Sequence, residues 1–175
     1  LDGAGVRTNG NASIRNNRFS NNRALEPGGG GRGAGIYVAA VNGPVEILGN
    51  RFEDQVAAQE CGALFVSGNA AVQIRGNLFA RCAAPLGQVM GLYGSQVLVE
   101  SNTIVDSGAS PSGAALLVDQ RSPGGAVTIR RNIVMGGAGV AVAWLHGGGE
   151  VTCNDLLGNA GGSLAGVVPG VLNNI

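Results

Sequence analysis

The 175-residue chain is long enough to bury a core, and its 11 basic residues balance its 11 acidic ones, so the formal net charge is zero. The basic residues are all arginines and form no block, which excludes a nucleic-acid partner held by a basic patch. An apolar share of 45% excludes disorder, and the 32 glycines follow no three-residue period, which excludes collagen. The longest nearly apolar run, residues 136–145, is too short to cross a bilayer, so we expect no membrane span.

One eight-residue pattern recurs along the chain. It has two apolar residues at alternate positions, an asparagine three residues after the second of them, and another apolar residue two positions later. The copies are residues 12–19, 45–52, 72–79, 97–104 and 127–134, with a shortened copy at 151–156. Alternation over such short stretches predicts β-strands that turn one face into a core.

A second pattern lies between these copies, where small residues lead into a short apolar stretch. One apolar anchor per repeat can be chosen: Val6, Ile36, Leu64, Leu92, Leu116, Val140 and Leu164, with spacings of 30, 28, 28, 24, 24 and 24 residues. Such a period, with several β-type segments per repeat, is typical of a solenoid. We predict about six rungs of parallel strands, a rod of roughly 30 Å at ~4.8 Å per strand.

These repeats resemble the right-handed parallel β-helix of the pectate-lyase-like superfamily, over the chain from Gly3 to about Leu164. The resemblance implies an all-β fold, but it leaves the activity open, because the superfamily mixes polysaccharide lyases, hydrolases, epimerases, adhesins and tailspikes. The leucine-rich repeat shares part of the pattern, yet the chain lacks its additional leucine and its helical stretch. We expect one domain over residues 1–175, a piece or mature part of a longer chain, in an extracellular, cell-surface or periplasmic location.

The recurring asparagine has a structural explanation. Asparagine tolerates the left-handed backbone conformation that a sharp corner needs, and stacked rungs let each side-chain amide bond to the next. We therefore predict an asparagine ladder formed by Asn17, Asn50, Asn77, Asn102, Asn132 and Asn154.

Alternation along the first strand of each repeat predicts an outward column on that sheet. The column reads Arg7, Tyr37, Phe65, Tyr93, Leu117 and Ala141. Aromatic side chains on neighbouring strands would give an exposed apolar stripe, which usually marks a binding surface. We expect an extended polysaccharide or a protein partner to bind there, with plain packing as the alternative. The predicted ligand-binding residues are Tyr37, Phe65, Tyr93, Leu117 and Asp119.

No catalytic constellation accompanies the repeats. His146 follows Trp144 in what reads as a loop, without a carboxylate nearby in sequence, and Trp144 could extend the apolar stripe. The carboxylates are scattered, whereas glycoside hydrolysis needs two that face each other. Lyases of the resembling family can use arginine as a base with Ca²⁺ on acids, but no acidic cluster lies beside Arg75 or Arg130 in sequence. We expect no catalytic residues, no metal and no cofactor.

The three cysteines, an odd number, do not form a disulfide framework. Cys153 occupies an inward position, where we expect a small buried hydrophobic side chain. Cys61 and Cys82 fall in different columns, so a bridge requires loops that bring them within about 7 Å.

Two classes of function follow. The first is a non-catalytic scaffold or contact partner in a larger assembly, with an end-to-end or capping contact to another chain as a further expectation, because open solenoid ends expose strand edges. The second is a polysaccharide lyase or hydrolase whose catalytic residues lie partly outside this chain.

Overall fold

The computed structural model of the chain describes residues 5–26, 31–40, 42–94, 96–108, 110–121, 125–166 and 170–175. Every regular element in these ranges is a β-strand. Among the same residues there is no helix with the length and hydropathy that a membrane span requires.

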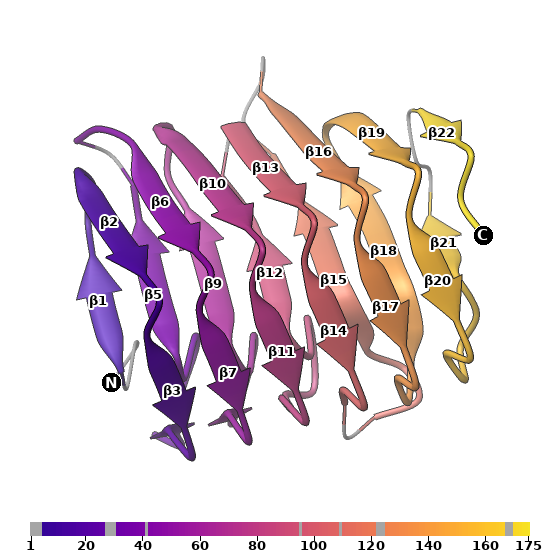
Figure 1. Cartoon of the computed structure of the whole chain (residues 1–175), viewed down its shortest axis with the longest axis horizontal. Helices are drawn as coiled ribbons and strands as arrows, with labels where there is room; N and C mark the ends of the chain where they lie inside the picture. The colour runs from indigo at the N-terminus through magenta and orange to yellow at the C-terminus, as the bar shows by residue number, and fades with distance from the viewer. Residues whose placement is uncertain are drawn as a thin grey trace.

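The strands form three long parallel sheets that wind around one core (Figure 1). Sheet A contains β1 (Val6–Thr8), β5 (Ile36–Ala39), β9 (Leu64–Ser67), β12 (Met90–Leu92), β15 (Ala114–Asp119), β18 (Val140–His146) and β21 (Leu164–Gly166). Sheet B contains β2 (Ala12–Arg15), β6 (Val45–Leu48), β10 (Ala71–Arg75), β13 (Gln96–Glu100), β16 (Ala126–Arg130), β19 (Gly148–Thr152) and β22 (Val171–Leu172). Sheet C contains β3 (Arg18–Ser20), β7 (Arg51–Glu53), β11 (Leu78–Ala80), β14 (Thr103–Val105), β17 (Ile133–Met135) and β20 (Asp155–Leu157). A short fourth sheet pairs β4 (Arg23–Ala24) with β8 (Val56–Ala57).

The register of sheets B and C is the one that the eight-residue pattern predicts. Val45 pairs with Val72, and Val72 pairs with Val97. In sheet C, Phe52 lies between Phe19 and Phe79. These inward columns are buried and fill one continuous core. The prediction of a parallel β-helix of about six rungs is confirmed, with seven strands in sheets A and B and six in sheet C.

The register of sheet A differs from the predicted one at two rungs. Leu64 and Leu116 both pair with Met90, so Met90, and not Leu92, is the equivalent residue of that rung. In the same way Val142, and not Val140, pairs with Leu116 and Leu164. Both errors are shifts of two residues, which leave every side chain on its predicted face, so alternation alone could not detect them.

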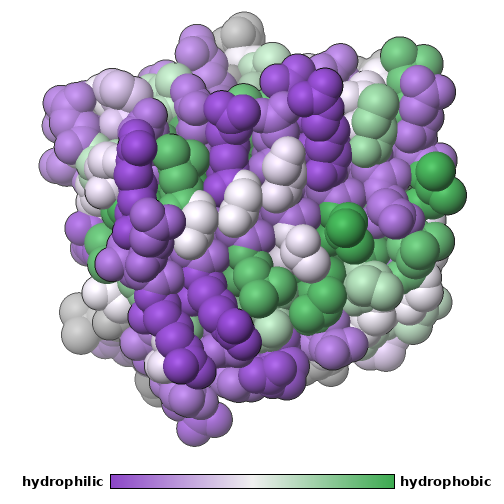
Figure 2. All heavy atoms as spheres, in the orientation of Figure 1, coloured by the Kyte–Doolittle hydropathy of each residue, from purple (hydrophilic) through white to green (hydrophobic). Residues whose placement is uncertain are grey.

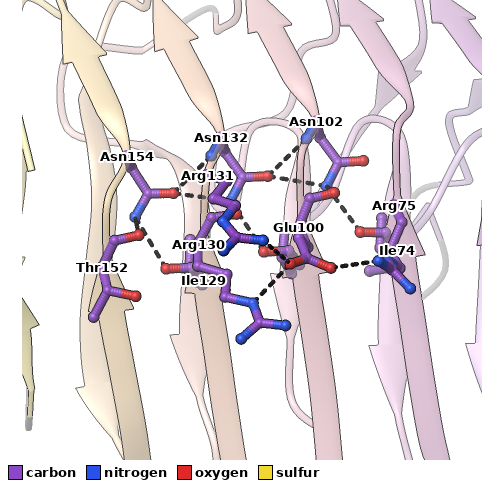
Figure 3. Close-up of polar contacts among 11 residues, drawn as sticks. Ile74, Arg75, Glu100, Asn102, Ile129, Arg130, Arg131, Asn132, Thr152 and Asn154 are labelled. Carbon is purple, nitrogen blue, oxygen red and sulfur yellow. Dashed lines mark hydrogen bonds and ion pairs between the residues drawn. The ribbon is translucent and has the colours of Figure 1, made fainter.

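The bend between sheets B and C contains the asparagine ladder, but the left-handed residue is the one before each asparagine. Positive φ values occur at the residues Asn16, Gly49, Gly76, Ser101, Arg131 and Cys153. The asparagines act through their amides instead. Asn102 Oδ1 accepts hydrogen bonds from the backbone N and Nδ2 of Asn77, both at 2.9 Å. Asn102 Nδ2 donates to Asn132 Oδ1 at 3.0 Å, as Figure 3 shows. The ladder itself is therefore confirmed, and its predicted conformational cause is wrong.

Cys153 is exposed, so the prediction that it is buried is wrong. The pattern places the second inward residue three positions before the asparagine, and for Asn154 that residue is Val151, which pairs with Ile129. Cys153 therefore occupies the bend, with φ of 54°.

Candidate functional site

The outer face of sheet A carries a ladder of stacked rings. The ring of Tyr37 lies 4.8 Å from that of Phe65, and the ring of Phe65 lies 5.0 Å from that of Tyr93. Arg7 lies over the outer face of Tyr37, with its guanidinium carbon 5.2 Å from the ring centroid. We call these four residues the aromatic ladder.

Tyr93 joins the ladder in a way that the sequence pattern did not predict. The residue paired with Phe65 on the next strand is Gly91, which also pairs with Leu117. A side chain at Gly91 would meet the Tyr93 ring, because a Cβ there would lie 2.7 Å from Tyr93 Cε2. The ring of Tyr93 therefore folds back over Gly91 and fills the missing position in the column. At the next two rungs the column continues with Leu117 and Ala143, where Ala141 was predicted.

The ladder is less exposed than a binding stripe was expected to be. Phe65 and Leu117 are each only 7% exposed, whereas Tyr37 and Tyr93 are partly exposed. Phe65 is stacked between Tyr37 and Tyr93, so both faces of its ring are covered. A sugar ring, which stacks on an open aromatic face, finds no such face on Phe65. The ligand-binding role assigned to Tyr37, Phe65, Tyr93, Leu117 and Asp119 stays a prediction.

A polar network flanks the ladder at Tyr93. The Tyr93 hydroxyl donates a hydrogen bond of 3.0 Å to Glu60 Oε2, and Arg32 Nε lies 3.5 Å from the same oxygen. The guanidinium of Arg32 also covers the Phe65 ring at 5.4 Å. Burial, together with the negative charge of Glu60, raises the pKa of Tyr93 well above its ordinary value, so the hydroxyl remains a donor. Tyr93 is thus fixed in place by its partners.

On the other side of Tyr93, Asp119 and His146 form a contact pair. His146 Nδ1 lies 2.7 Å from Asp119 Oδ1, and Arg121 approaches the same carboxylate with Nε at 3.0 Å and Nη2 at 2.8 Å. These hydrogen bonds, first that of Arg121 and then that of His146, hold the pKa of Asp119 below its ordinary value. The side chain of His146 is 59% exposed, so its other ring nitrogen is open to a ligand.

His146 and Trp144 belong to β18, so the prediction of a loop is wrong. A register irregularity after Val118, which pairs with Trp144, brings His146 opposite Asp119 and leaves Leu145 unpaired between them. Trp144 is 1% exposed and points into the core, so it does not extend the apolar stripe. The sequence did carry one signal for the Asp119–His146 contact, because their separation of 27 residues is about one repeat.

Sheet B carries a second charged cluster around Glu100, which is 2% exposed. Its carboxylate oxygens lie 2.8 Å from Arg75 Nη2, 2.8 Å from Arg130 Nε and 3.4 Å from Arg131 Nη1 (Figure 3). The alternation of sheet B places Glu100 on the outward face, where an ordinary solvated side chain would be expected, but the structure buries it. The register brings this one carboxylate between Arg75 and Arg130, without forming an acidic cluster there. A shallow hollow of about 300 Å³ on this sheet is lined by Gln73, Leu98 and Thr128, among others, and not by Glu100.

Several other ion pairs of the described residues also join neighbouring rungs, whereas Arg51 and Glu53 pair within β7. Arg15 contacts Glu46, Arg18 contacts Glu53 at 2.9 Å, and Arg81 Nε contacts Asp54 at 2.7 Å. Hydrogen bonds from arginine are the largest cause that lowers the pKa of Glu46, Glu53 and Asp54. A general acid at neutral pH needs a raised pKa, so these carboxyls are suited to binding cations and not to donating protons.

The cysteines form no site among the described residues. Cys61 and Cys82 are both buried free thiols, so the open possibility of a bridge is resolved against it. Burial raises the pKa of both thiols, that of Cys82 to about 12, which keeps them protonated. Within the same part of the chain, no three His, Cys, Asp or Glu side chains gather as a metal site would require.

Comparison with known proteins agrees with this geometry. A family profile described as a right-handed beta helix region matches residues 2–166. No curated protein and no solved structure gives a significant match. With parallel strands stacked in register over the same residues, the chain belongs to the right-handed β-helix family.

Proposed function

We propose that the chain is a non-catalytic module of the cell surface, the periplasm or the extracellular space, and that it serves as a scaffold or contact partner in a larger assembly. The outer face of sheet A is the contact surface in this proposal. The observation that carries it is the aromatic ladder, which runs without a break from Arg7 to Tyr93. Leu117 and the Asp119–His146 pair continue the same face toward the C-terminus.

The chemistry of this face favours an extended ligand held by polar contacts. The edges of Tyr37 and Tyr93 face outward beside Arg7, Arg121 and His146, whose side chains offer several hydrogen-bond donors. An extended polysaccharide, lying along the solenoid axis, is the first ligand to test. Its hydroxyl or carboxylate groups would meet these donors, while the ring edges would contact its apolar C–H groups. A protein segment is the other partner considered.

The scaffold role is supported by how the charges are used. Arginine–carboxylate pairs such as Arg15–Glu46 and Arg81–Asp54 link residues on neighbouring rungs, 31 and 27 residues apart in sequence. These pairs keep the carboxylates ionised and tie the rungs together. Side chains employed in this way stabilise a rod and are poorly placed for acid–base catalysis.

One observation favours the second candidate, a polysaccharide lyase or hydrolase. A carboxylate bound to Nδ1 of a histidine orients the ring and stabilises its protonated form, which is an arrangement that enzymes use for general bases. Asp119 and His146 have this geometry at 2.7 Å, beside the proposed ligand face. The remaining catalytic groups would come from outside this chain.

The test is a glycan-array binding screen with matched variants. We expect binding that is lost in Tyr37→Ala/Tyr93→Ala and weakened in Arg121→Ala, while Thr128→Ala, on the outer face of sheet B, binds like the wild type. Far-ultraviolet circular dichroism confirms that each variant folds. Binding that all the sheet A variants retain would contradict the proposed face, and the absence of binding to any glycan would direct the search to a protein partner.

The same glycans separate the two candidate functions. Each bound glycan is incubated with the protein and assayed for new reducing ends and for unsaturated products. We expect no turnover. Turnover that disappears in His146→Gln would establish the enzyme instead.

A further inference from the structure

The outer face of sheet C changes character along the solenoid. Over β3 and β7 it is charged, and over the later strands it is apolar (Figure 2, where green side chains gather over β11, β14, β17 and β20). Ile133, Met135 and Leu157 are 40%, 42% and 45% exposed. Leu78 and Val105 are partly exposed beside them. We call these five residues the sheet C patch. Large exposed side chains that are contiguous on one sheet face mark an interaction surface.

The strand register arranges this face in two outward rows. One row reads Arg18, Arg51, Leu78, Thr103, Ile133 and Asp155, and the other reads Ser20, Glu53, Ala80, Val105, Met135 and Leu157. The inward residues between the rows are buried in the core. The face is therefore a regular array, and its side chains change from charged to apolar along the solenoid axis.

The two ends of the array differ in charge. At the β3–β7 end, Arg18 and Arg51 both contact Glu53, and Arg81 contacts Asp54, so three arginines face two carboxylates and one positive charge is in excess. At the β20 end stands Asp155, a partly exposed carboxylate whose Oδ1 is buried and whose other oxygen is left to carry the contact with solvent or a partner. Positive charge, apolar surface and negative charge thus follow one another along one face.

We propose that a second copy of this chain binds the sheet C patch in the antiparallel direction. The twofold axis lies in the interface and runs along β14, so that β11 faces β17 of the second copy and β7 faces β20. Arg51 then meets Asp155 of the other copy, and Leu78 meets Ile133. The buried Ala80, which is small, lies opposite the long side chain of Met135. A parallel arrangement would instead place the arginines of both copies together and is disfavoured by like-charge repulsion.

The size of the sheet C face sets the affinity that we expect for the dimer. Six strands at ~4.8 Å spacing and three residues at ~3.3 Å give a footprint of about 30 by 10 Å. This is below the ~800 Å² per partner of a standard stable interface, so we expect a weak, concentration-dependent dimer. The proposal concerns sheet C and is independent of the ligand face on sheet A.

The first experiment measures the molecular mass by sedimentation equilibrium over a wide range of protein concentration. We expect a reversible monomer–dimer equilibrium for the wild type, and a monomer for Met135→Glu, because a carboxylate would be buried in the apolar centre of the interface. Thr128→Glu, the matched change on the outer face of sheet B, should dimerise like the wild type. A wild type that stays monomeric at every concentration overturns the proposal. So does a dimer that Met135→Glu leaves intact, because that dimer would form through another surface, such as the solenoid ends.

The second experiment tests the antiparallel register by exchanging charges. Arg51→Glu and Asp155→Arg should each weaken the dimer about tenfold or more, since each places like charges opposite one another at both symmetric contacts. The double variant should recover wild-type dimerisation. Glu53 has a second partner in Arg18, 2.9 Å away, which remains in Arg51→Glu, and circular dichroism checks that this variant folds. A double variant that is as weak as the single ones refutes the antiparallel register.

Discussion

At the scale of single residues, the asparagines of the bend show how one side chain can join three rungs. Asn102 Nδ2 donates to the carbonyl of Ile74 at 2.8 Å on one side and to Asn132 Oδ1 at 3.0 Å on the other. Asn102 is 1% exposed, so water cannot replace these bonds if the side chain is removed. The preceding residue provides the left-handed turn, and its identity is free to vary from glycine to arginine.

We predict that Asn102→Ala lowers the free energy of unfolding by about 2–4 kcal/mol, because it leaves several buried polar groups without partners. The control is Asn17→Ala, at the exposed end of the ladder, for which we expect a loss below about 1 kcal/mol. Urea denaturation of both variants measures the difference. Equal losses would mean that the ladder does not depend on burial.

At the scale of elements, the phenylalanine rings on the inner face of sheet C also form a stack whose middle is more buried than its end. The Phe52 ring lies 4.7 Å from the rings of both Phe19 and Phe79, with interplanar angles of 4° and 8°. Phe52 is fully buried, whereas Phe19, at the end of the stack, is 9% exposed. The parallel register of β3, β7 and β11 produces this arrangement, because it repeats the same side-chain position on each strand.

We predict that Phe52→Ala destabilises the protein by about 3–5 kcal/mol, through lost apolar contacts and the cavity that remains. Phe19→Ala should cost clearly less, since only one neighbouring ring packs on it. Thermal and urea unfolding compare the two variants. A smaller loss for Phe52→Ala than for Phe19→Ala would contradict the packing described here.

At the scale of the whole molecule, the balanced charges are organised as ion pairs, some between neighbouring rungs, as Arg15 with Glu46, and some within a rung, as Arg51 with Glu53. The pKa values of Glu46, Glu53, Asp54 and Asp119 are all lowered, in each case chiefly by an arginine. A carboxyl group with a lowered pKa in the folded protein binds protons more readily once the chain unfolds. Acid therefore favours the unfolded state.

We predict that stability is complete above about pH 4.3, the ordinary range of free carboxyl groups, and falls as the pH drops through the lowered values of the folded protein. Urea titrations at a series of pH values measure this slope. The double variant Arg15→Ala/Arg81→Ala should show a shallower slope, because Glu46 and Asp54 lose their partners. An unchanged slope would show that these ion pairs do not contribute to the acid sensitivity.

The parts of the fold that the sequence predicted are those carried by strict repetition. The positions of Val45, Ile47 and Phe52 are filled by apolar residues in each repeat, always at the same distance from an asparagine. The register of sheets B and C therefore follows from the pattern. Sheet A lacks such a marker, and the connections that lead to it vary in length. Its register was therefore wrong by two residues at Met90 and Val142, although the inward and outward faces were right.

The candidate site shows the same division. The sequence indicated Tyr37, Phe65 and Leu117 as one outward column, and the strand pairing confirms it. The return of the Tyr93 ring over Gly91 depends on the local space beside Cys61, which no pattern encodes. The contact of Asp119 with His146 likewise depends on the register irregularity at Leu145, which leaves Leu145 unpaired and brings His146 opposite Asp119.

The sequence by itself determined a parallel β-helix, its number of rungs, its asparagine ladder and the facing of most strand residues, because these follow from the period and from alternation, while the right hand was implied by the family resemblance. Only the tertiary structure decided which charges and rings meet between rungs, such as Glu100 with its arginines or Asp119 with His146. The physical reason is that a shift of two residues preserves facing but changes every neighbour. Neighbours across rungs are selected by the hydrogen-bond register and by loop length.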